Sequence, residues 1–185
     1  ALCIIDSGAD HADLTAEYAA IPQEMKAVAA YFGCEVLREV DESRIWADMP
    51  GLRKAVGDRA VLRALHFFAD DQRVALEADA LERGDFDAFL KVVQQSGESS
   101  WMYLQNIAPT GAVAEQAMAV ALATAGHALK GRGAYRVHGG GFAGTIQAFV
   151  PLDMLDEFKT TVESVLGTGS CHVLTVRAVG GAVVC

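Results

Sequence analysis

The chain of 185 residues has few cysteines, few basic residues and no long apolar run. Its four cysteines, Cys3, Cys34, Cys171 and Cys185, include no C-x-x-C pair. They are too sparse for a disulfide scaffold, so we expect reduced thiols in a cytoplasmic protein rather than disulfide bridges. Cys171 precedes His172, but adjacent residues of a strand point to opposite faces, and this argues against a metal site built on the pair.

The charge balance is acidic, with 24 Asp and Glu residues against 15 Lys and Arg residues and a formal net charge of −9. The basic residues are scattered, whereas nucleic-acid binding requires clustered Lys and Arg, so we expect no nucleic-acid partner. No apolar stretch approaches the about 20 residues that cross a bilayer, so we expect no membrane span. Hydrophobic residues make up 52% of the chain, which excludes intrinsic disorder and predicts a folded domain with a sizeable core.

The N-terminus has neither an initiator Met nor a signal segment. The chain opens with the apolar run from Leu2 to Asp6, which breaks at Ser7-Gly8. This pattern is typical of a buried strand that enters a turn. Because the sequence begins inside a strand, we expect it to be a piece of a longer protein.

Helical patterns fill the middle of the chain. Apolar residues from Met25 to Phe32 recur at i, i+3, i+4 and i+7, which predicts an amphipathic helix that ends at Gly33. The pattern turns helical from about Leu14, and Thr15 with Glu17 and Tyr18 gives a plausible N-terminal turn. Proline fits the first turn of a helix but not its middle, so we expect the regular helix to begin near Pro22. Helical spacing also covers residues 52–68, 74–81, 85–93 and 113–129, while residues 35–48 are ambiguous.

Two pairs of features in these helices have more than one interpretation. Asp70-Asp71 could be a metal-binding pair, but we favour an N-terminal cap for the helix at 74–81. Aromatic residues at helical spacing are typical of a core rather than of a cofactor site. We therefore expect the pairs Phe67-Phe68 and Phe86-Phe89 to be buried.

Short strands follow Gly131. They are predicted over residues 134–137, 145–150, 172–176 and 182–184, with a turn at Gly180-Gly181 before the last one. Between them, residues 153–166 form an amphipathic pattern with Asp153 as the candidate N-cap. Helices in the middle and strands at both ends predict an α+β fold, in which a small, mostly antiparallel sheet packs with helices.

A glycine-rich segment is the part of the sequence that points most directly to chemistry. Six of the 18 glycines lie between residues 131 and 144. Glycine permits positive φ and lets backbone N–H groups converge on an anion, but hairpin turns and tight packing use it as well. No Lys-Ser/Thr follows the glycines, so the segment is not a Walker loop.

This segment resembles the third conserved motif of the galactokinases, which are small-molecule kinases of the GHMP superfamily. The motif runs roughly G-x-R-x-T-G-x-G-F-G-G, and the matching residues here are Gly133-Ala134-Tyr135-Arg136-Val137-His138-Gly139-Gly140-Gly141-Phe142-Ala143-Gly144. Two further segments match the family in the same order: the run from Asp6 to Tyr18, with Ser7, His11 and Tyr18 at family spacing, and Leu81-Glu82-Arg83-Gly84-Asp85-Phe86. Together the three matches cover essentially the whole chain.

The resemblance implies that residues 1–185 are a galactokinase-like C-terminal domain, with a ferredoxin-like element plus extra helices. It implies a parent protein that transfers the γ-phosphoryl group of ATP to the C1 hydroxyl of galactose. ATP and Mg²⁺ would be bound mainly by an N-terminal domain that is absent from this chain. The family's catalytic base and Ser-rich phosphate loop also belong to that domain, so the resemblance implies no catalytic residue and no metal ligand here, and an inactive fragment. The partners implied are galactose or a related hexose and the protein's own N-terminal domain.

Position by position, the resemblance assigns Tyr18 to the sugar. It assigns a loop near the phosphates and nucleotide to Gly139, Gly140, Gly141, Phe142 and Gly144. Tyr18 could instead simply pack at the start of a helix. His138 could meet a phosphate or fill a turn, and we favour the turn; we expect His11 to cap or pack rather than to catalyse.

The sequence departs from the family at three places. His138 stands where the motif has Thr or Ser, Ala143 replaces one glycine, and Ala19-Ala20 stand where a basic pair commonly follows the tyrosine. Three alternatives therefore stay open: a GHMP kinase for another sugar or small alcohol, a galactokinase-like sensor that binds sugar and ATP without catalysis, and a free-standing binding module.

Overall fold

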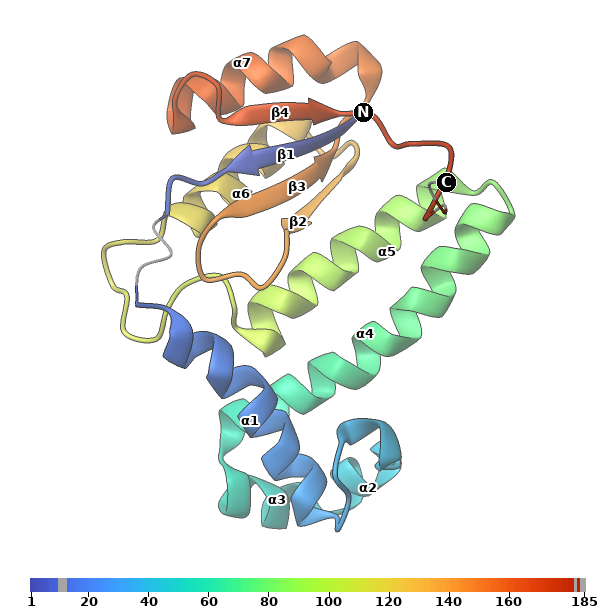
Figure 1. The fold of residues 1–185 in the computed structure, drawn as a ribbon, viewed down its shortest axis with the longest axis vertical. Helices are drawn as coiled ribbons and strands as arrows, with labels where there is room; N and C mark the ends of the chain where they lie inside the picture. Colours follow the sequence, from blue (N-terminus) through green and yellow to red (C-terminus); the bar gives the residue numbers. More distant parts are fainter. Residues whose placement is uncertain (10–12, 182, 184–185) are drawn as a thin grey trace.

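The fold is taken from a computed structural model that describes residues 1–9, 13–181 and 183. Four short strands form one antiparallel sheet in the order β2-β3-β1-β4 (Figure 1). The strands are β1 (Leu2–Asp6), β2 (Ala134–Val137), β3 (Thr145–Phe149) and β4 (Cys171–Leu174). Strand β1 therefore pairs with β4 on one side and, on the other, with β3 of the hairpin that contains the glycine-rich segment. The predicted α+β fold with a small antiparallel sheet is confirmed.

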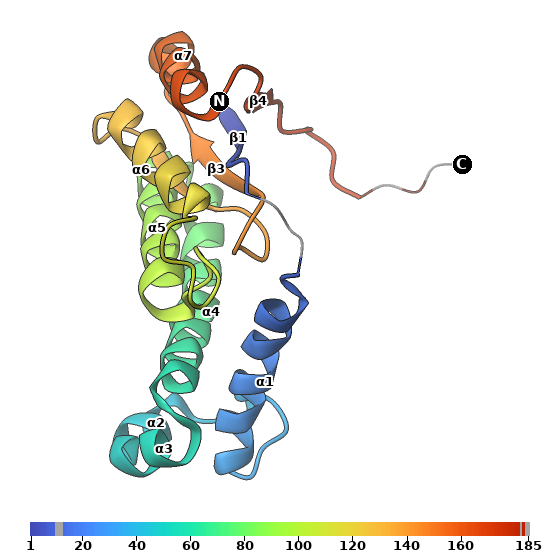
Figure 2. The same ribbon diagram turned by 90° about the vertical axis from the view of Figure 1, so that its left-hand side faces the viewer.

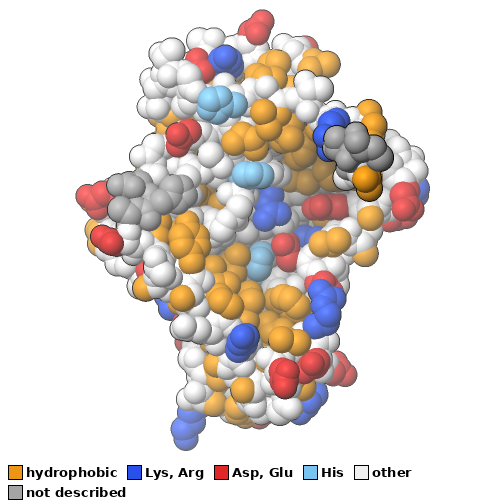
Figure 3. All heavy atoms as spheres, viewed as in Figure 1, with side chains coloured by type: hydrophobic (Ala, Val, Ile, Leu, Met, Phe, Trp, Pro, Cys, Tyr) orange, Lys and Arg blue, Asp and Glu red, His pale blue; other side chains and the backbone are white. Residues whose placement is uncertain are grey.

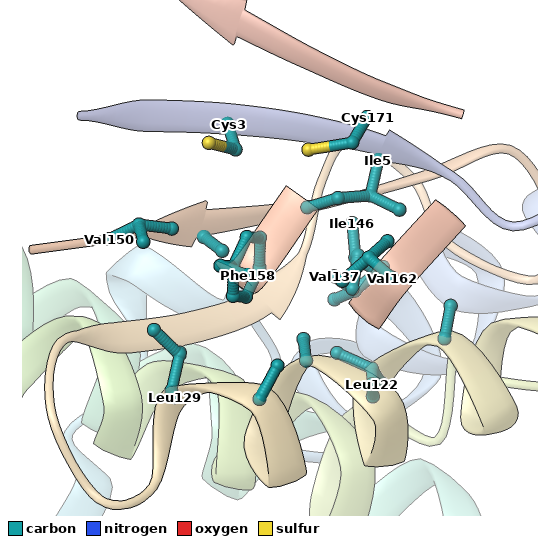
Figure 4. Close-up of a cluster of buried hydrophobic side chains, with 14 of the residues drawn as sticks. Cys3, Ile5, Leu122, Leu129, Val137, Ile146, Val150, Phe158, Val162 and Cys171 are labelled. Carbon is teal, nitrogen blue, oxygen red and sulfur yellow. The ribbon is translucent and has the colours of Figure 1, made fainter. Parts of the chain in front are cut away.

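One face of the sheet carries the main hydrophobic core. Side chains alternate along a strand, so Ile5 shares this face with Ile146 and Cys171, which lie opposite it on the neighbouring strands. The helices α6 (Ala117–Leu129) and α7 (Leu155–Leu166) cover this face (Figures 1 and 2), and Figure 4 shows Phe158 and Val162 of α7 pointing into the core. A 3₁₀ turn, η3 (Leu152–Met154), leads into α7. Cys171 and Cys3 are buried free thiols in this core.

The remaining helices form a second lobe below the sheet in Figure 1. They are α1 (Thr15–Tyr31), η1 (Leu37–Glu39), α2 (Glu42–Ala47), α3 (Met49–Val56), α4 (Asp58–Glu82), α5 (Phe86–Ser99) and the π-helical turn η2 (Ser100–Leu104). A second core, which includes Val28, Ile45 and Leu52, holds α1 and α3 against α4. Helix α5 connects the two lobes, because it packs along α4 and against the edge strand β2.

Helix α1 begins earlier than predicted, at Thr15, and continues through Pro22. The reason is a second apolar stripe: Leu14, Tyr18 and Ile21 recur at i, i+4 and i+7 and pack against Phe142 of the glycine-rich segment. These tertiary contacts offset the roughly 3 kcal/mol that an internal proline costs a helix.

The expected break at Asp70-Asp71 is wrong, because α4 runs unbroken through both residues. Their side chains make tertiary contacts instead of capping a helix: Ser96 Oγ donates to Asp70 at 2.6 Å, and Arg38 pairs with Asp71 at 2.7 Å. The segment contains no glycine or proline that would end the helix. Gly57 is the break, with φ 86° between α3 and α4.

Several further predictions are corrected, concerning a helix cap, the burial of one aromatic residue and the bounds of two elements. Asp153 does not cap α7 but pairs with Arg132 at 2.6 Å, and Phe86 is 51% exposed rather than core. The predicted helix at 113–129 begins at Ala117, and the predicted strand at 172–176 is β4. His11, Cys185 and most of the expected strand at 182–184 lie outside the described residues.

Basic, acidic and apolar side chains are interspersed on the face shown in Figure 3. That view contains no continuous basic surface of the kind that neutralises a phosphate backbone. Within the described ranges, no helix combines the length and hydropathy needed to span a membrane.

Candidate functional site

Tyr18 and the glycine-rich segment, which the sequence analysis assigned to one site, lie in contact. The Tyr18 hydroxyl donates a hydrogen bond to the carbonyl oxygen of Gly141 at 2.9 Å. Its ring meets that of Phe142 edge-on, with 5.5 Å between ring centroids. A Cβ on Gly140 would lie 2.8 Å from Cε1 of the same ring, so the close approach requires glycine there. The fold thus joins α1 to the loop between β2 and β3.

The loop between β2 and β3 (residues 138–144, here the glycine loop) has an unusual backbone. Gly139, Gly141 and Gly144 have φ of 77°, 83° and 85°, and Phe142 also has a positive φ of 61°. A positive φ is strained for an aromatic residue, so the surrounding contacts must hold it. One of them is the hydrogen bond from the Phe142 amide to the carbonyl of Asn106 at 2.5 Å.

Ser7 anchors the far end of the glycine loop. This buried residue follows β1, and both its amide (2.9 Å) and its hydroxyl (2.6 Å) donate to the carbonyl oxygen of Gly144. At the near end, the amide of His138 donates to the carbonyl of Thr145 at 3.0 Å. Two of the three family-like segments are therefore bonded to each other. The role of Ser7 as an anchor was not predicted; the available signal is its place directly after the first strand.

Backbone donors are available at the tip of the glycine loop. The amides of Gly139, Gly140 and Gly141 bond to no acceptor among residues 1–9 and 13–181, and the first two of these residues are exposed. Successive glycine amides in a tight loop can form a concave nest that binds an anion. The loop has room for such a ligand at Gly139, where an added Cβ would meet nothing within 4 Å.

His138 precedes these glycines and is exposed. Its Nδ1 lies 2.9 Å from Oε1 of Gln147 on β3. An amide oxygen only accepts, so in this arrangement Nδ1 carries the proton and Nε2 is directed away from Gln147. The contact orients the ring, and it is compatible both with a turn residue and with an anion ligand.

A buried ion-pair network supports the Tyr18 side of the site. Arg63 of α4 is fully buried and donates to Glu24 of α1 at 2.9 Å and to the Leu104 carbonyl at 3.1 Å. Burial lowers the pKa of Arg63, whereas the hydrogen bond to Glu24 raises the pKa of its neighbour Arg59. Arg59 also donates to Thr110 at 2.8 Å. No sequence motif indicates this network; the available signal is an arginine inside an apolar helical stripe.

A cavity of about 610 Å³ adjoins the glycine loop. Ser7, Gly8 and Phe142 line one side of it, and the first turn of α6 with Gln116 and Met118 lines the other. No cluster of three or more His, Cys, Asp or Glu side chains suited to a metal ion occurs within the described part of the chain.

No protein-family model matches the chain. Curated relatives do: a galactokinase of Mannheimia succiniciproducens is 29% identical over 162 residues, and galactokinases of two Haemophilus influenzae strains are each 26% identical over 162 residues. Each of these alignments covers 88% of this chain but 40% of the relative. The chain therefore spans about two fifths of the length of the curated relatives it matches.

A solved structure has the same fold. The Lactococcus lactis galactokinase, crystallised with galactose, matches 92% of this chain and 43% of its own chain, with a TM-score of 0.67 and 21% identity. The fold match extends over both the sheet and the helical lobe, because it omits less than a tenth of the chain. The resemblance predicted from three sequence segments is thereby confirmed: the chain is similar in sequence to about two fifths of the curated galactokinases, and it has the fold of the matching part of a solved one.

Proposed function

We propose that this chain is the C-terminal domain of a galactokinase, which transfers the γ-phosphoryl group of ATP to the C1 hydroxyl of galactose. The observation that carries the proposal is the contact between Tyr18 and the glycine loop, because it brings together the two segments that the family resemblance assigns to sugar and phosphates. The names of the relatives and the partial coverage of their length support it. A cytoplasmic location fits the free thiols of Cys3, Cys34 and Cys171.

In this proposal the glycine loop closes one side of the active-site cleft. Phosphoryl transfer needs positioning and stabilisation of charge more than covalent help from the protein. The amides of Gly139 and Gly140 belong to exposed residues and bond to no acceptor within the described residues. They fit that task, since N–H groups held in a rigid loop stabilise a phosphoryl oxygen without reorganising. Mg²⁺, when bound, would neutralise phosphate charge, and its ligands and most ATP contacts would come from the N-terminal domain.

Tyr18 would orient the sugar. Its hydroxyl lies 2.9 Å from the carbonyl oxygen of Gly141, so a sugar bound beside Tyr18 would also lie beside the glycine loop. Ring packing against Phe142 and Gly140 limits rotation of the side chain. The sugar contact and the loop would thus form one preorganised wall.

The test is an assay of ADP release from ATP and galactose with the full-length protein and, separately, with residues 1–185. We expect galactose-dependent ADP release from the full-length protein and none from the fragment, because the family resemblance places the phosphate loop and the base in the N-terminal domain. A full-length protein that binds galactose and ATP without turnover would overturn the enzymatic proposal and favour a sensor.

One observation favours a second substrate. Ala19 and Ala20 follow Tyr18 where the family commonly has a basic pair, and a changed neighbour of the sugar residue changes which hydroxyls can be bound. A panel of hexoses and small alcohols in the same assay separates a galactokinase from a related sugar kinase.

A further inference from the structure

The segment that follows η2 passes directly beneath the glycine loop. Gln105 takes the left-handed conformation, with φ 57°, and its amide donates to the Ser100 carbonyl at 2.8 Å. This sharp reversal ends the π-helical turn and brings the next residue, Asn106, against the loop. Asn106 is 2% exposed, so its carboxamide is enclosed by protein.

Asn106 contacts three successive residues of the glycine loop. Its carbonyl oxygen accepts from the Phe142 amide at 2.5 Å, and its Nδ2 donates to the Gly140 carbonyl at 3.2 Å. Between these two contacts, a Cβ on Gly141 would overlap the Asn106 carbonyl oxygen. One residue therefore fixes both sides of the loop tip and the strained φ of Phe142.

The other half of the Asn106 carboxamide is unsatisfied. Its Oδ1 is buried and has no hydrogen-bond partner in the described part of the chain. A buried acceptor without a partner destabilises the folded state, and an apolar side chain of similar volume would avoid that penalty. Stability alone would thus favour an apolar residue at this position. What the asparagine adds is the Nδ2 hydrogen bond to the Gly140 carbonyl, which an apolar side chain cannot form.

We propose that Asn106 is a positioning residue for phosphoryl transfer, which holds the glycine loop in one arrangement before ATP binds. The inference rests on the proposed function for its effect on catalysis, but not for its effect on the loop. The Asn106 side chain would act through the Gly140 carbonyl rather than by touching the substrate. The bond to the Phe142 amide comes from the Asn106 backbone carbonyl, which the substitutions below retain. Its loss should lower kcat more than it raises KM for galactose, because loop amides act on charge that develops during transfer.

The test uses the full-length protein with Asn106→Ala and Asn106→Leu. Ser100→Ala is the matched control, because Ser100 is also buried with an unpartnered side-chain oxygen but forms no hydrogen bond to the loop within the described residues. Amide hydrogen exchange is measured at the hydrogen-bonded loop amides of His138, Phe142 and Ala143, together with kcat, KM for galactose and the melting temperature. We expect exchange at the loop to rise at least about ten-fold and kcat to fall at least about ten-fold in both Asn106 variants. The KM for galactose should change less than about three-fold, and Asn106→Leu should melt no lower than the wild type.

Wild-type loop exchange in both Asn106 variants would overturn the proposal, and so would unchanged kcat per folded molecule in both. If Asn106→Leu does not fold, Asn106→Ala decides, since it introduces no added volume. If the wild-type protein does not phosphorylate galactose, the proposed function fails, and hydrogen exchange alone decides whether Asn106 orders the loop.

Discussion

The hydroxyl of Tyr18 and the carbonyl oxygen of Gly141 are 2.9 Å apart, although 123 residues separate them in the chain. This bond links the first helix to the loop between two late strands. Tyr18 packs against Phe142 on the same loop, so a change at the hydroxyl alone leaves the ring contact in place. Substitutions at this pair can therefore separate sugar binding from packing.

Tyr18→Phe in the full-length protein should raise KM for galactose about ten-fold, which corresponds to the loss of about one hydrogen bond. Stability should change by no more than about 1 kcal/mol, because the ring stays. Tyr31→Phe is the matched control: Tyr31 lies at the other end of α1, and its exposed hydroxyl donates to Asp48 at 2.6 Å. Steady-state kinetics with varied galactose measure the effect. Equal KM values for the wild type and Tyr18→Phe would refute a sugar contact.

Gly141→Ala should disrupt the loop far more than Gly139→Ala does. Both glycines have positive φ, but an added Cβ at Gly141 would overlap Asn106, whereas at Gly139 it meets nothing within 4 Å. We expect Gly139→Ala to cost about 1 kcal/mol, from backbone strain alone, and Gly141→Ala to cost more than about 2 kcal/mol. Urea unfolding followed by circular dichroism measures both. Similar losses in the two variants would contradict the close approach of Asn106.

Arg63→Met should destabilise the chain by about 2–4 kcal/mol. The substitution removes a buried guanidinium and leaves the Leu104 carbonyl without that donor, although Arg59 still pairs with Glu24. The exposed pair of Arg53 and Asp58 supplies the control, and Arg53→Met should cost less than about 1 kcal/mol. Denaturant midpoints of the two variants are compared directly. A loss below 1 kcal/mol for Arg63→Met would mean that water replaces the guanidinium.

The sequence predicts the sheet better than it predicts the helical lobe, for a physical reason. Glycines on either side of a short apolar run fix where a strand can begin and end, so β2 and β3 lie close to their predicted positions. Helix boundaries depend on contacts across the chain. From the sequence alone, Leu14, Tyr18 and Ile21 could equally face solvent. Only the glycine loop that packs against them shows that they face the protein interior.

In the candidate site too, residues within local motifs could be predicted, whereas residues placed by tertiary contacts could not. The resemblance indicated Tyr18 and the glycines because they stand at family spacing within short segments. Asn106 and Arg63 were not predicted from the sequence, because their roles depend on the path of the chain after η2 rather than on a local motif. A single buried polar residue in an apolar pattern is the kind of signal that only a folded structure makes specific.

The buried imidazole of His66 should make stability depend on pH. It lies on α4, with Nδ1 2.9 Å from Ser99 Oγ and Nε2 3.7 Å from Asp70. Burial lowers the pKa of His66 below its ordinary value of 6.5, with smaller contributions from Arg136 and Arg73, while Asp70 opposes the shift. The unfolded chain therefore takes up a proton at a higher pH than the folded chain does. The free energy of unfolding should fall as pH decreases below about 6.5, with a slope of up to about 1.4 kcal/mol per pH unit.

His66→Gln should remove this part of the slope, and His138→Gln should leave it intact, because His138 is exposed. Glu77 has a pKa raised by burial and contributes a slope of opposite sign, but it is present in both variants. Urea unfolding at half-unit steps from pH 5 to pH 8 measures the difference. If His66→Gln and the wild type lose stability in parallel below pH 6.5, the imidazole takes up its proton equally in the folded and unfolded chains, and its burial does not control the pH response.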